Sequence, residues 1–324
     1  MQNFVLPTSF YFEIIPEAEG IYRVAKSIKQ LLPSTEILWP LIIWVGLLFF
    51  ISLVPVVPND IWWHLKIGEQ IFTTHEIPTT NQFAWSIPRD QPYHYGAWLG
   101  ELLLYLCYKL GRLELAIFAR NLMGGLFFGL NVNETWRRSG SWRLGALSLA
   151  LAGCMTLNNL IVRPQIWSWV PFMLFLLILG CYTQRKVSNF VLLALPLIMT
   201  VWVNLHGAFI LGVVLIGIYF VGEAIRTQLH SENALSWYQV RWIGASGLLT
   251  GIAMLANPRG AGIIAYLVDL MTDKPSQSLI AEWQSPTMEG FANTAFFISV
   301  MLLLVIMAAS RYRLIPTDIL LVVG

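Results

Sequence analysis

The chain is dominated by apolar runs about as long as a membrane is thick. The first covers residues 37–57, and others follow at intervals as far as residue 309. A helix needs roughly 20 apolar residues to cross the hydrocarbon core, where only helices and closed barrels satisfy their backbone hydrogen bonds. Only 12% of the residues are charged, whereas an ordinary soluble domain carries about twice that share. The sequence therefore predicts an all-α polytopic membrane protein rather than a large soluble core.

These runs define one membrane domain, residues 37–324. We predict about eight or nine transmembrane helices in it, each close to the length that crosses a bilayer. The predicted crossings are residues 37–57, 113–135, 144–160, 165–182, 189–205, 207–224, 242–256 and 291–309. Residues 314–324 begin a run too short to cross, so we expect the chain to stop within a span. Residues 1–36 are predicted to be a cytoplasmic N-terminal segment, because charges interrupt any apolar core that a signal peptide would need.

Basic residues orient the chain in the membrane. Arg23, Lys26 and Lys29 precede the first span, so the positive-inside rule places the N-terminus in the cytoplasm. The polar stretch 58–101 is then the first extracytoplasmic loop. The inner turns collect most of the remaining basic side chains: Arg137, Arg138, Arg143, Arg185, Lys186, Arg226, Arg241, Arg311 and Arg313. Residues 257–290 form a later outer loop, with a short helix expected at 261–270.

Residues 97–110 admit two interpretations. The segment is apolar but short, and it contains Glu101 and Lys109. If it crossed the membrane, the basic turn 136–143 would lie outside, against the charge rule. If it lies on the surface or re-enters, residues 113–135 make the crossing and the turn lies inside. We favour the second interpretation, which gives the outer loop two juxtamembrane helices, at 60–73 and 97–110.

The outer loop holds the acidic residues best placed for chemistry. Asp60 follows the first span, and Glu101 opens the second surface helix. A carboxylate at a dry membrane boundary can act as general base toward an acceptor hydroxyl, or it can hold a divalent metal beside a phosphate. Asp60 and His64, at positions i and i+4, could share such a metal, although a hydrogen bond between them is the simpler interpretation. Alternatively, Asp60 caps the first surface helix, and Glu101 pairs with Lys109 or Arg120.

A second group of polar residues lies at the outer ends of later spans. A guanidinium binds phosphate through two parallel hydrogen bonds, so Arg120, Arg163 and Arg259 are candidate ligands for a lipid phosphate. Each could instead reach the headgroups or pair with a carboxylate. Neighbouring side chains are candidates for binding the rest of a substrate: Gln165, Asn204, His206 and Asn257. A packing role is an equal alternative for His206.

The outer loop carries a family resemblance. Its residues Asp60-Ile61-Trp62-Trp63-His64-Leu65, with Gly68, Pro78, Phe83 and Ser86, then Trp98-Leu99-Gly100-Glu101, resemble the first outer loop of membrane glycosyltransferases of the C superfamily (GT-C). The resemblance is to the bacterial branch similar to protein mannosyltransferases and lipid A aminoarabinose transferases, and it covers about residues 37–310. It implies two juxtamembrane helices, an acidic residue soon after the first span and an arginine in the next, matching Arg120. Asp60 stands alone where many relatives have two adjacent acidic residues, so the cofactor is undefined beyond a candidate divalent metal.

Residues and resemblance together imply an inverting glycosyltransferase. It would use a polyprenyl-phosphate sugar at the extracytoplasmic face of a bacterial inner membrane, with Asp60 as base, Glu101 and His206 as supporting residues and the three arginines as phosphate ligands. The alternative is a non-catalytic membrane scaffold or carrier for lipid-linked envelope glycans. A transporter fits less well, because the polar residues crowd one leaflet and no internal repeat is present. A net charge of +2 gives no indication of a nucleic-acid partner.

Cysteine labelling of intact cells tests this topology. A cysteine at Ser139, in the inner turn 136–143, should be protected from a membrane-impermeant reagent, whereas a cysteine at Ser86, in the outer loop, should react. Labelling of position 139 from outside would show that residues 97–110 cross the membrane.

Overall fold

The computed structural model describes residues 35–56, 58, 60–85, 88–93, 95–274, 278, 285–310 and 314–323. Within these ranges the chain is helical, with no strand beyond an isolated bridge between Thr80 and Pro92. The prediction of an all-α fold is therefore confirmed. Nearly all of the predicted segment 1–36 lies outside the described ranges, as do Ser86, Arg311 and Arg313.

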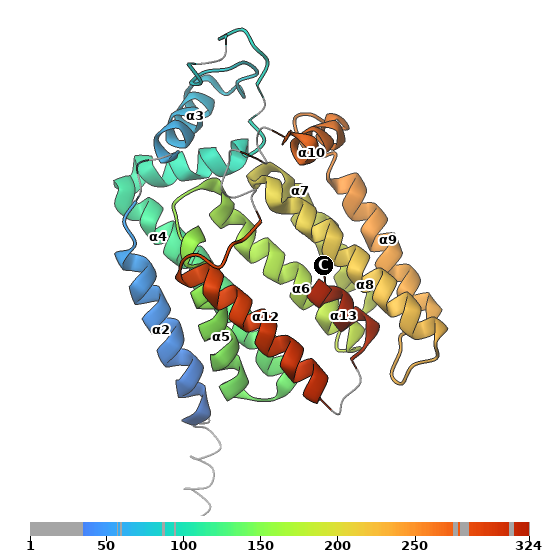
Figure 1. Ribbon diagram of the computed structural model, residues 1–324. Helices are drawn as coiled ribbons and strands as arrows, with labels where there is room; N and C mark the ends of the chain where they lie inside the picture. The colour runs from blue at the N-terminus through green and yellow to red at the C-terminus, as the bar shows by residue number, and fades with distance from the viewer. Residues whose placement is uncertain are drawn as a thin grey trace, which may run out of the picture.

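The helices lie side by side as a bundle, with two short elements across one end (Figure 1). In chain order they are α2 (Leu38–Leu53), α3 (Ile61–Thr74), α4 (Trp98–Ser139), α5 (Trp142–Thr156), α6 (Trp169–Thr183), α7 (Ala194–Leu205), α8 (Ile210–Gln228), α9 (Trp237–Ala253), α10 (Gly262–Thr272), α12 (Phe291–Ala309) and α13 (Pro316–Val323). Short 3₁₀ turns lead into four of them: η2 (Thr35–Ile37), η4 (Pro164–Ser168), η5 (Asn189–Leu193) and η6 (Gly207–Phe209). The outer helix expected at 261–270 is α10.

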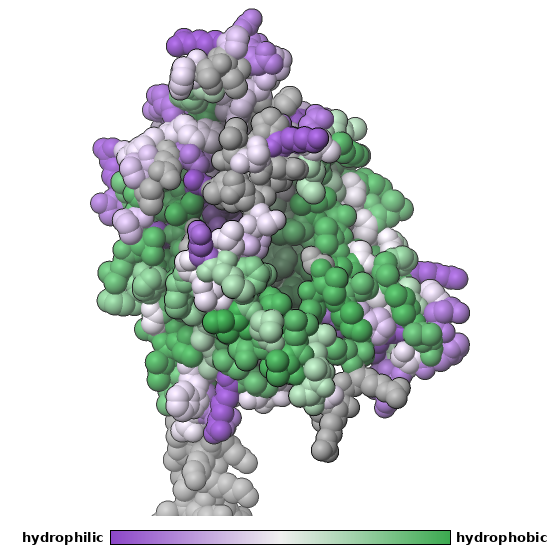
Figure 2. All heavy atoms as spheres, in the orientation of Figure 1, coloured by the Kyte–Doolittle hydropathy of each residue, from purple (hydrophilic) through white to green (hydrophobic). Residues whose placement is uncertain are grey.

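Four helical segments of the described chain are long and apolar enough to cross a membrane: Thr35–Leu53, Pro164–Thr183, Gly207–Gln228 and Phe291–Ala309. On the face shown in Figure 2, apolar residues form a broad band across the middle of the molecule, and hydrophilic residues gather toward its ends. These features support a membrane protein. The other predicted crossings correspond to shorter helices or to part of α4, so the total of eight or nine stays a prediction.

The α4 helix is two helices joined by a break. Gly111 and Arg112 have non-helical backbone angles, and Arg112 has a φ of 54°. The first part, up to the break, lies across the end of the bundle, and the second part runs along it (Figure 1). This geometry agrees with the interpretation of residues 97–110 as a separate short helix ahead of the crossing.

The first part of α4 is clamped between α3 and the later helices at two glycines. A methyl group on Gly68 of α3 would lie 2.3 Å from the carbonyl oxygen of Glu101, and one on Gly100 would lie 2.4 Å from the carbonyl oxygen of Leu205. Trp167 donates its indole N–H to the Gly100 carbonyl at 3.1 Å. Backbone packed this closely against backbone fixes where the outer loop sits on the bundle.

The largest hydrophobic cluster lies between α6, α7, α8 and α9. The rings of Phe175 and Trp202, both completely buried, meet edge to face with their centroids 5.4 Å apart. Aromatic contacts of this kind add to the packing that holds membrane helices together, where lipid is as apolar as the side chains.

Replacing Gly100 with alanine should destabilise the protein by about 1–3 kcal/mol, because the added methyl forces α4 away from the end of α7. Gly217→Ala in α8 is the matched control, since nothing lies within 4 Å of its added methyl, and helix propensity there favours alanine by roughly 0.5–1 kcal/mol. Thermal unfolding in detergent measures both. Equal melting temperatures for the two variants would contradict the clamp.

Candidate functional site

The structure pairs Asp60 with Arg163. The carboxylate oxygen Oδ2 lies 2.9 Å from Arg163 Nη2, with the Asp60 side chain 42% exposed and the Arg163 side chain 20% exposed. Asp60 occupies the cap position of α3 but makes no capping hydrogen bond. The alternatives that Asp60 caps α3 or bonds to His64 are therefore wrong, because its carboxylate turns to the arginine.

Arg163 is held at this place by its own sequence context. Proline at 164 keeps the preceding residue out of the helical region, and Arg163 is extended, with a φ of −142° and a ψ of 165°. Its side chain therefore leaves the chain just before η4 begins. Gln165, two residues further, donates to the carbonyl oxygen of Asn159 at 3.3 Å.

Glu101 and His64 form a second, buried pair. His64 Nδ1 lies 2.9 Å from Glu101 Oε1, and the two residues are 8% and 1% exposed. Glu101 lies in the first turn of α4, where the helix dipole favours a negative charge. Its other oxygen, Oε2, has no hydrogen-bond partner among the described residues. The alternative that Glu101 pairs with Lys109 or Arg120 is wrong, because its partner is His64. Lys109 lies over the ring of Phe72, 3.6 Å from its centroid.

His206 lies between α7 and η6, where the backbone is extended. Its Nδ1 accepts the backbone N–H of Ala208 at 3.2 Å and lies 3.4 Å from Ser168 Oγ, which accepts the indole N–H of Trp202. Burial, with a smaller effect from the nearby charge of His64, lowers the pKa of His206 to about 4. The imidazole is therefore neutral near pH 7, which suits it to hydrogen bonding rather than to holding a proton.

His206 and Gln165 line a cavity of about 280 Å³ between α4, α5, α6 and α8. Most of its wall is apolar and aromatic, including Phe127, Phe172 and Leu211. The polar lining residues are Thr156, Asn159, Gln165, Ser168 and His206. The cavity therefore combines a long apolar wall with a few polar groups, as sites for amphipathic ligands do.

Arg120 lies in a different environment from that expected of a phosphate ligand. It is completely buried, and it donates to the backbone carbonyls of Ile51, Val54 and Leu160 at 2.6, 3.2 and 3.1 Å. Its Nε donates to Asn121 at 3.2 Å. Through these hydrogen bonds Arg120 joins α4 to the end of α2 and to the segment at Leu160.

Asn204 and Asn257 also make structural contacts. Asn204 accepts the indole N–H of Trp98 at 2.8 Å and donates to the carbonyl of Ala256 at 2.8 Å, so it joins the start of α4 to the end of α9. Asn257 shapes its own turn by bonding to Met254, Arg259 and Gly260.

Arg259 lies over the ring of Tyr266 in α10, with its guanidinium carbon 4.4 Å from the ring centroid. Its Nη2 is buried with no hydrogen-bond partner among the described residues. Burial raises the pKa of Tyr266, so the phenol stays neutral beside the guanidinium. Gly96, just ahead of α4, packs near Tyr266, and this places Arg259 on the α10 side of the outer loop.

The structure thus gathers six of the predicted residues around the cavity end and the adjoining loop: Asp60, His64, Glu101, Arg163, Gln165 and His206. Sequence reasoning missed Ser168 and Tyr266. Ser168 lies three residues after Gln165, on the same side of a helical turn. This spacing could have predicted Ser168 as a neighbour of Gln165 in the site. Tyr266 had no such signal, because only the fold brings it to Arg259.

The suggestion that Asp60 and His64 share a metal is not supported by their contacts. Each has its own partner, Arg163 and Glu101 respectively. Across the described ranges, no three His, Cys, Asp or Glu side chains come together as metal ligands.

The low pKa of His206 predicts a pH dependence of stability. Between pH 6.5 and about 4 the unfolded chain takes up a proton at this histidine and the folded protein does not, so stability falls as the pH falls through that window, by at most about 3 kcal/mol. His206→Asn keeps an acceptor for Ala208 and removes the titration, so this variant should lose less stability on acidification than the wild type.

Thermal unfolding at pH 7.5 and pH 4.5 measures the difference. His75→Asn is the matched control, because His75 is exposed at the end of α3 and asparagine tolerates its left-handed backbone. Identical pH profiles for wild type and His206→Asn would show that His206 titrates normally.

Comparison with known proteins assigns no family to this arrangement. No family model, no curated protein and no solved structure matches the chain.

Proposed function

We propose that the protein is a membrane glycosyltransferase that takes a sugar from a polyprenyl-phosphate donor and passes it to an acceptor at the outer face of the membrane. One observation carries the proposal. A carboxylate and a guanidinium, Asp60 and Arg163, meet at 2.9 Å, and Gln165, two residues further along the chain, lines an apolar cavity. Transfer of a sugar from a lipid-linked phosphate needs three features together: an apolar wall for the lipid chain, a ligand for the phosphate and a base for the acceptor hydroxyl.

Each residue has a role in this proposal. The guanidinium of Arg163 binds the donor phosphate through paired hydrogen bonds and stabilises the charge that develops when it leaves. Binding of the phosphate frees Asp60, which accepts the proton of the acceptor hydroxyl. The acceptor oxygen then bonds to the anomeric carbon, the bond from that carbon to the phosphate oxygen breaks, and polyprenyl phosphate departs.

Two neutral or paired groups support this chemistry. His206, neutral near pH 7, presents a ring nitrogen for a sugar hydroxyl at the cavity wall. Glu101 holds His64 in place from the first turn of α4, and its free oxygen offers a further acceptor. Arg259 serves the substrate from the α10 side.

The membrane arrangement is part of the same proposal. About eight segments cross the bilayer, namely α2, the second part of α4, α5, α6, α7, α8, α9 and α12, and those shorter than roughly 20 residues are extended by their flanking turns. The N-terminus lies in the cytoplasm of a bacterium, and α3 and the first part of α4 lie at the outer surface of its inner membrane. Hydrophilic residues at that end of the molecule support its position at a membrane surface (Figure 2).

A non-catalytic carrier of lipid-linked glycans is the second candidate. It is favoured by the way the polar side chains already satisfy one another, Asp60 with Arg163 and Glu101 with His64. A carrier would bind the lipid phosphate and leave the sugar in place, so a transfer assay separates the two functions.

Asp60→Asn should lower glycosyl transfer by roughly 10²-fold or more, the scale of lost general-base catalysis. The asparagine retains a hydrogen-bond acceptor for Arg163, and a half-exposed ion pair contributes only about 0–1 kcal/mol, so folding should be preserved. Transfer from a polyprenyl-phosphate sugar in membranes measures the loss, beside unfolding of the purified protein.

Asp90→Asn is the matched control, because Asp90 is an exposed acid in the same outer loop and should leave transfer unchanged. Full activity in Asp60→Asn would remove Asp60 from the reaction. Binding of the lipid phosphate by the wild type without any transfer would favour the carrier.

A further inference from the structure

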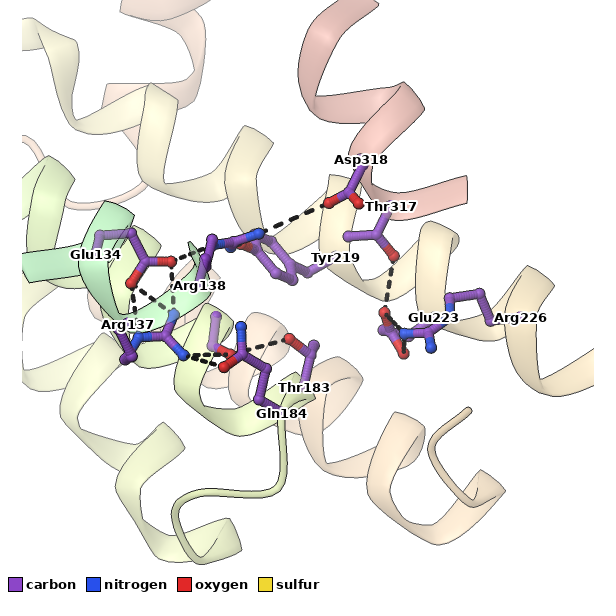
Figure 3. A network of polar contacts seen from close by, with 11 residues as sticks. Glu134, Arg137, Arg138, Thr183, Gln184, Tyr219, Glu223, Arg226, Thr317 and Asp318 are labelled. Carbon is purple, nitrogen blue, oxygen red and sulfur yellow. Dashed lines mark hydrogen bonds and ion pairs between the residues drawn. The ribbon is translucent and has the colours of Figure 1, made fainter. Parts of the chain in front are cut away.

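A second polar cavity lies at the end of the bundle opposite the outer loop. It has a volume of about 640 Å³ and is enclosed by side chains from the ends of α4, α6 and α8 and by the start of α13. Its charged lining residues are Arg138, Arg185, Lys186, Glu223, Arg226 and Asp318. Figure 3 shows several of them facing one another across the helix ends. None of them belongs to the proposed glycosyltransferase site.

The acidic groups in this region are already engaged. Glu134 accepts hydrogen bonds from Arg137 at 2.5 and 2.6 Å and also from Arg138. Glu223, completely buried, accepts from Arg226 at 2.8 and 2.9 Å and from the hydroxyl of Thr317 at 2.8 Å (Figure 3). The carboxylates are therefore fixed within the protein and offer little to an incoming cation.

The basic groups are in excess. Four basic side chains line the cavity against two acidic ones. Within the described part of the chain, the hydrogen bonds of Arg185 and Lys186 go to backbone carbonyls, those of Ala234 and Arg137, and both side chains are exposed.

A buried donor adds to this excess. Arg226 is only 7% exposed and lines the cavity, and its Nε has no acceptor among the described residues. A buried guanidinium N–H without an acceptor costs free energy that an anion would recover.

We propose that this cavity binds a phosphate group. Guanidinium groups match phosphate geometry, an ammonium adds a point charge, and uncharged donors on Gln184 and Asn233 line the same space. The volume lies within the range of about 300–1,000 Å³ that small-molecule sites occupy. The phosphate could come from an anionic phospholipid headgroup at the cytoplasmic leaflet, the side on which the predicted topology places this end, or from a soluble phosphate ester.

The C-terminal helix forms one wall of this site. Thr317 lies so close to α8 that a methyl on Gly222 would meet its hydroxyl at 2.5 Å, and Asp318 lies 3.7 Å from Arg138. Because ligand binding stabilises the folded state that holds the site, a bound phosphate should also secure α13 on α8.

Thermal unfolding of the purified full-length protein tests the proposal with two probes. Inorganic pyrophosphate in detergent should raise the melting temperature, and so should phosphatidylglycerol in otherwise neutral nanodiscs. A response to both probes assigns the site to phosphate itself, whereas a response to the lipid alone assigns it to a headgroup. No response to either probe overturns the proposal.

The double variant Arg185→Gln/Lys186→Gln should weaken binding of the effective probe by at least tenfold. Both side chains are exposed, so the variant should fold. Arg241→Gln is the matched control, because Arg241 is exposed in the first turns of α9 near the same end and does not line the cavity. Equal weakening by Arg241→Gln would show that only general surface charge is sensed, and would also overturn the proposal. Glycosyl transfer plays no part in this measurement, so its outcome is independent of the function proposed for the outer site.

Discussion

Arg120, buried within the second part of α4, holds together the chain segments on which the outer site depends. Two of the carbonyls it binds, those of Ile51 and Val54, belong to the end of α2, where the helix stops and its last carbonyls lose their regular helical donors. The Ile51 carbonyl also accepts the Val54 N–H at 3.0 Å. A third, at Leu160, lies ahead of η4. In an apolar medium such groups must find partners within the protein. One side chain supplies donors to all three.

The position of the candidate site follows from that tie. Asp60 comes soon after Val54, and Arg163 comes soon after Leu160, so fixing both carbonyls to Arg120 brings the two charged residues within reach of each other. The glycines at 68 and 100 then set the outer helices against the bundle. An arginine that does not line the cavity therefore fixes the chain segments that carry the Asp60–Arg163 pair.

The sequence predicted the helices well, but it predicted the pairing of side chains less well. Apolar runs predicted the helices, and the short apolar segment ahead of residue 111 was correctly separated from the helix that follows it. Pairings were harder, because they depend on which helix ends meet in space. The Asp60 carboxylate could have bonded to His64 on its own helix, but the tie at Arg120 brings Arg163 closer. The cavity at the end of the bundle opposite the outer loop likewise requires residues from four helices. No local sequence pattern predicts such a cavity.

The contact between Thr317 and Glu223 has a consequence for how the protein is made. The two residues are 94 positions apart in the chain, and a ribosome adding roughly 5–20 residues per second needs about 5–20 s to cover that distance. Throughout that interval α8 is complete, yet Glu223 lacks its hydroxyl donor and the groove at Gly222 has no occupant. The α8 wall of this cavity is therefore made well before the α13 wall, and the hydrogen bond between Thr317 and Glu223 can form only after α13 has been synthesised.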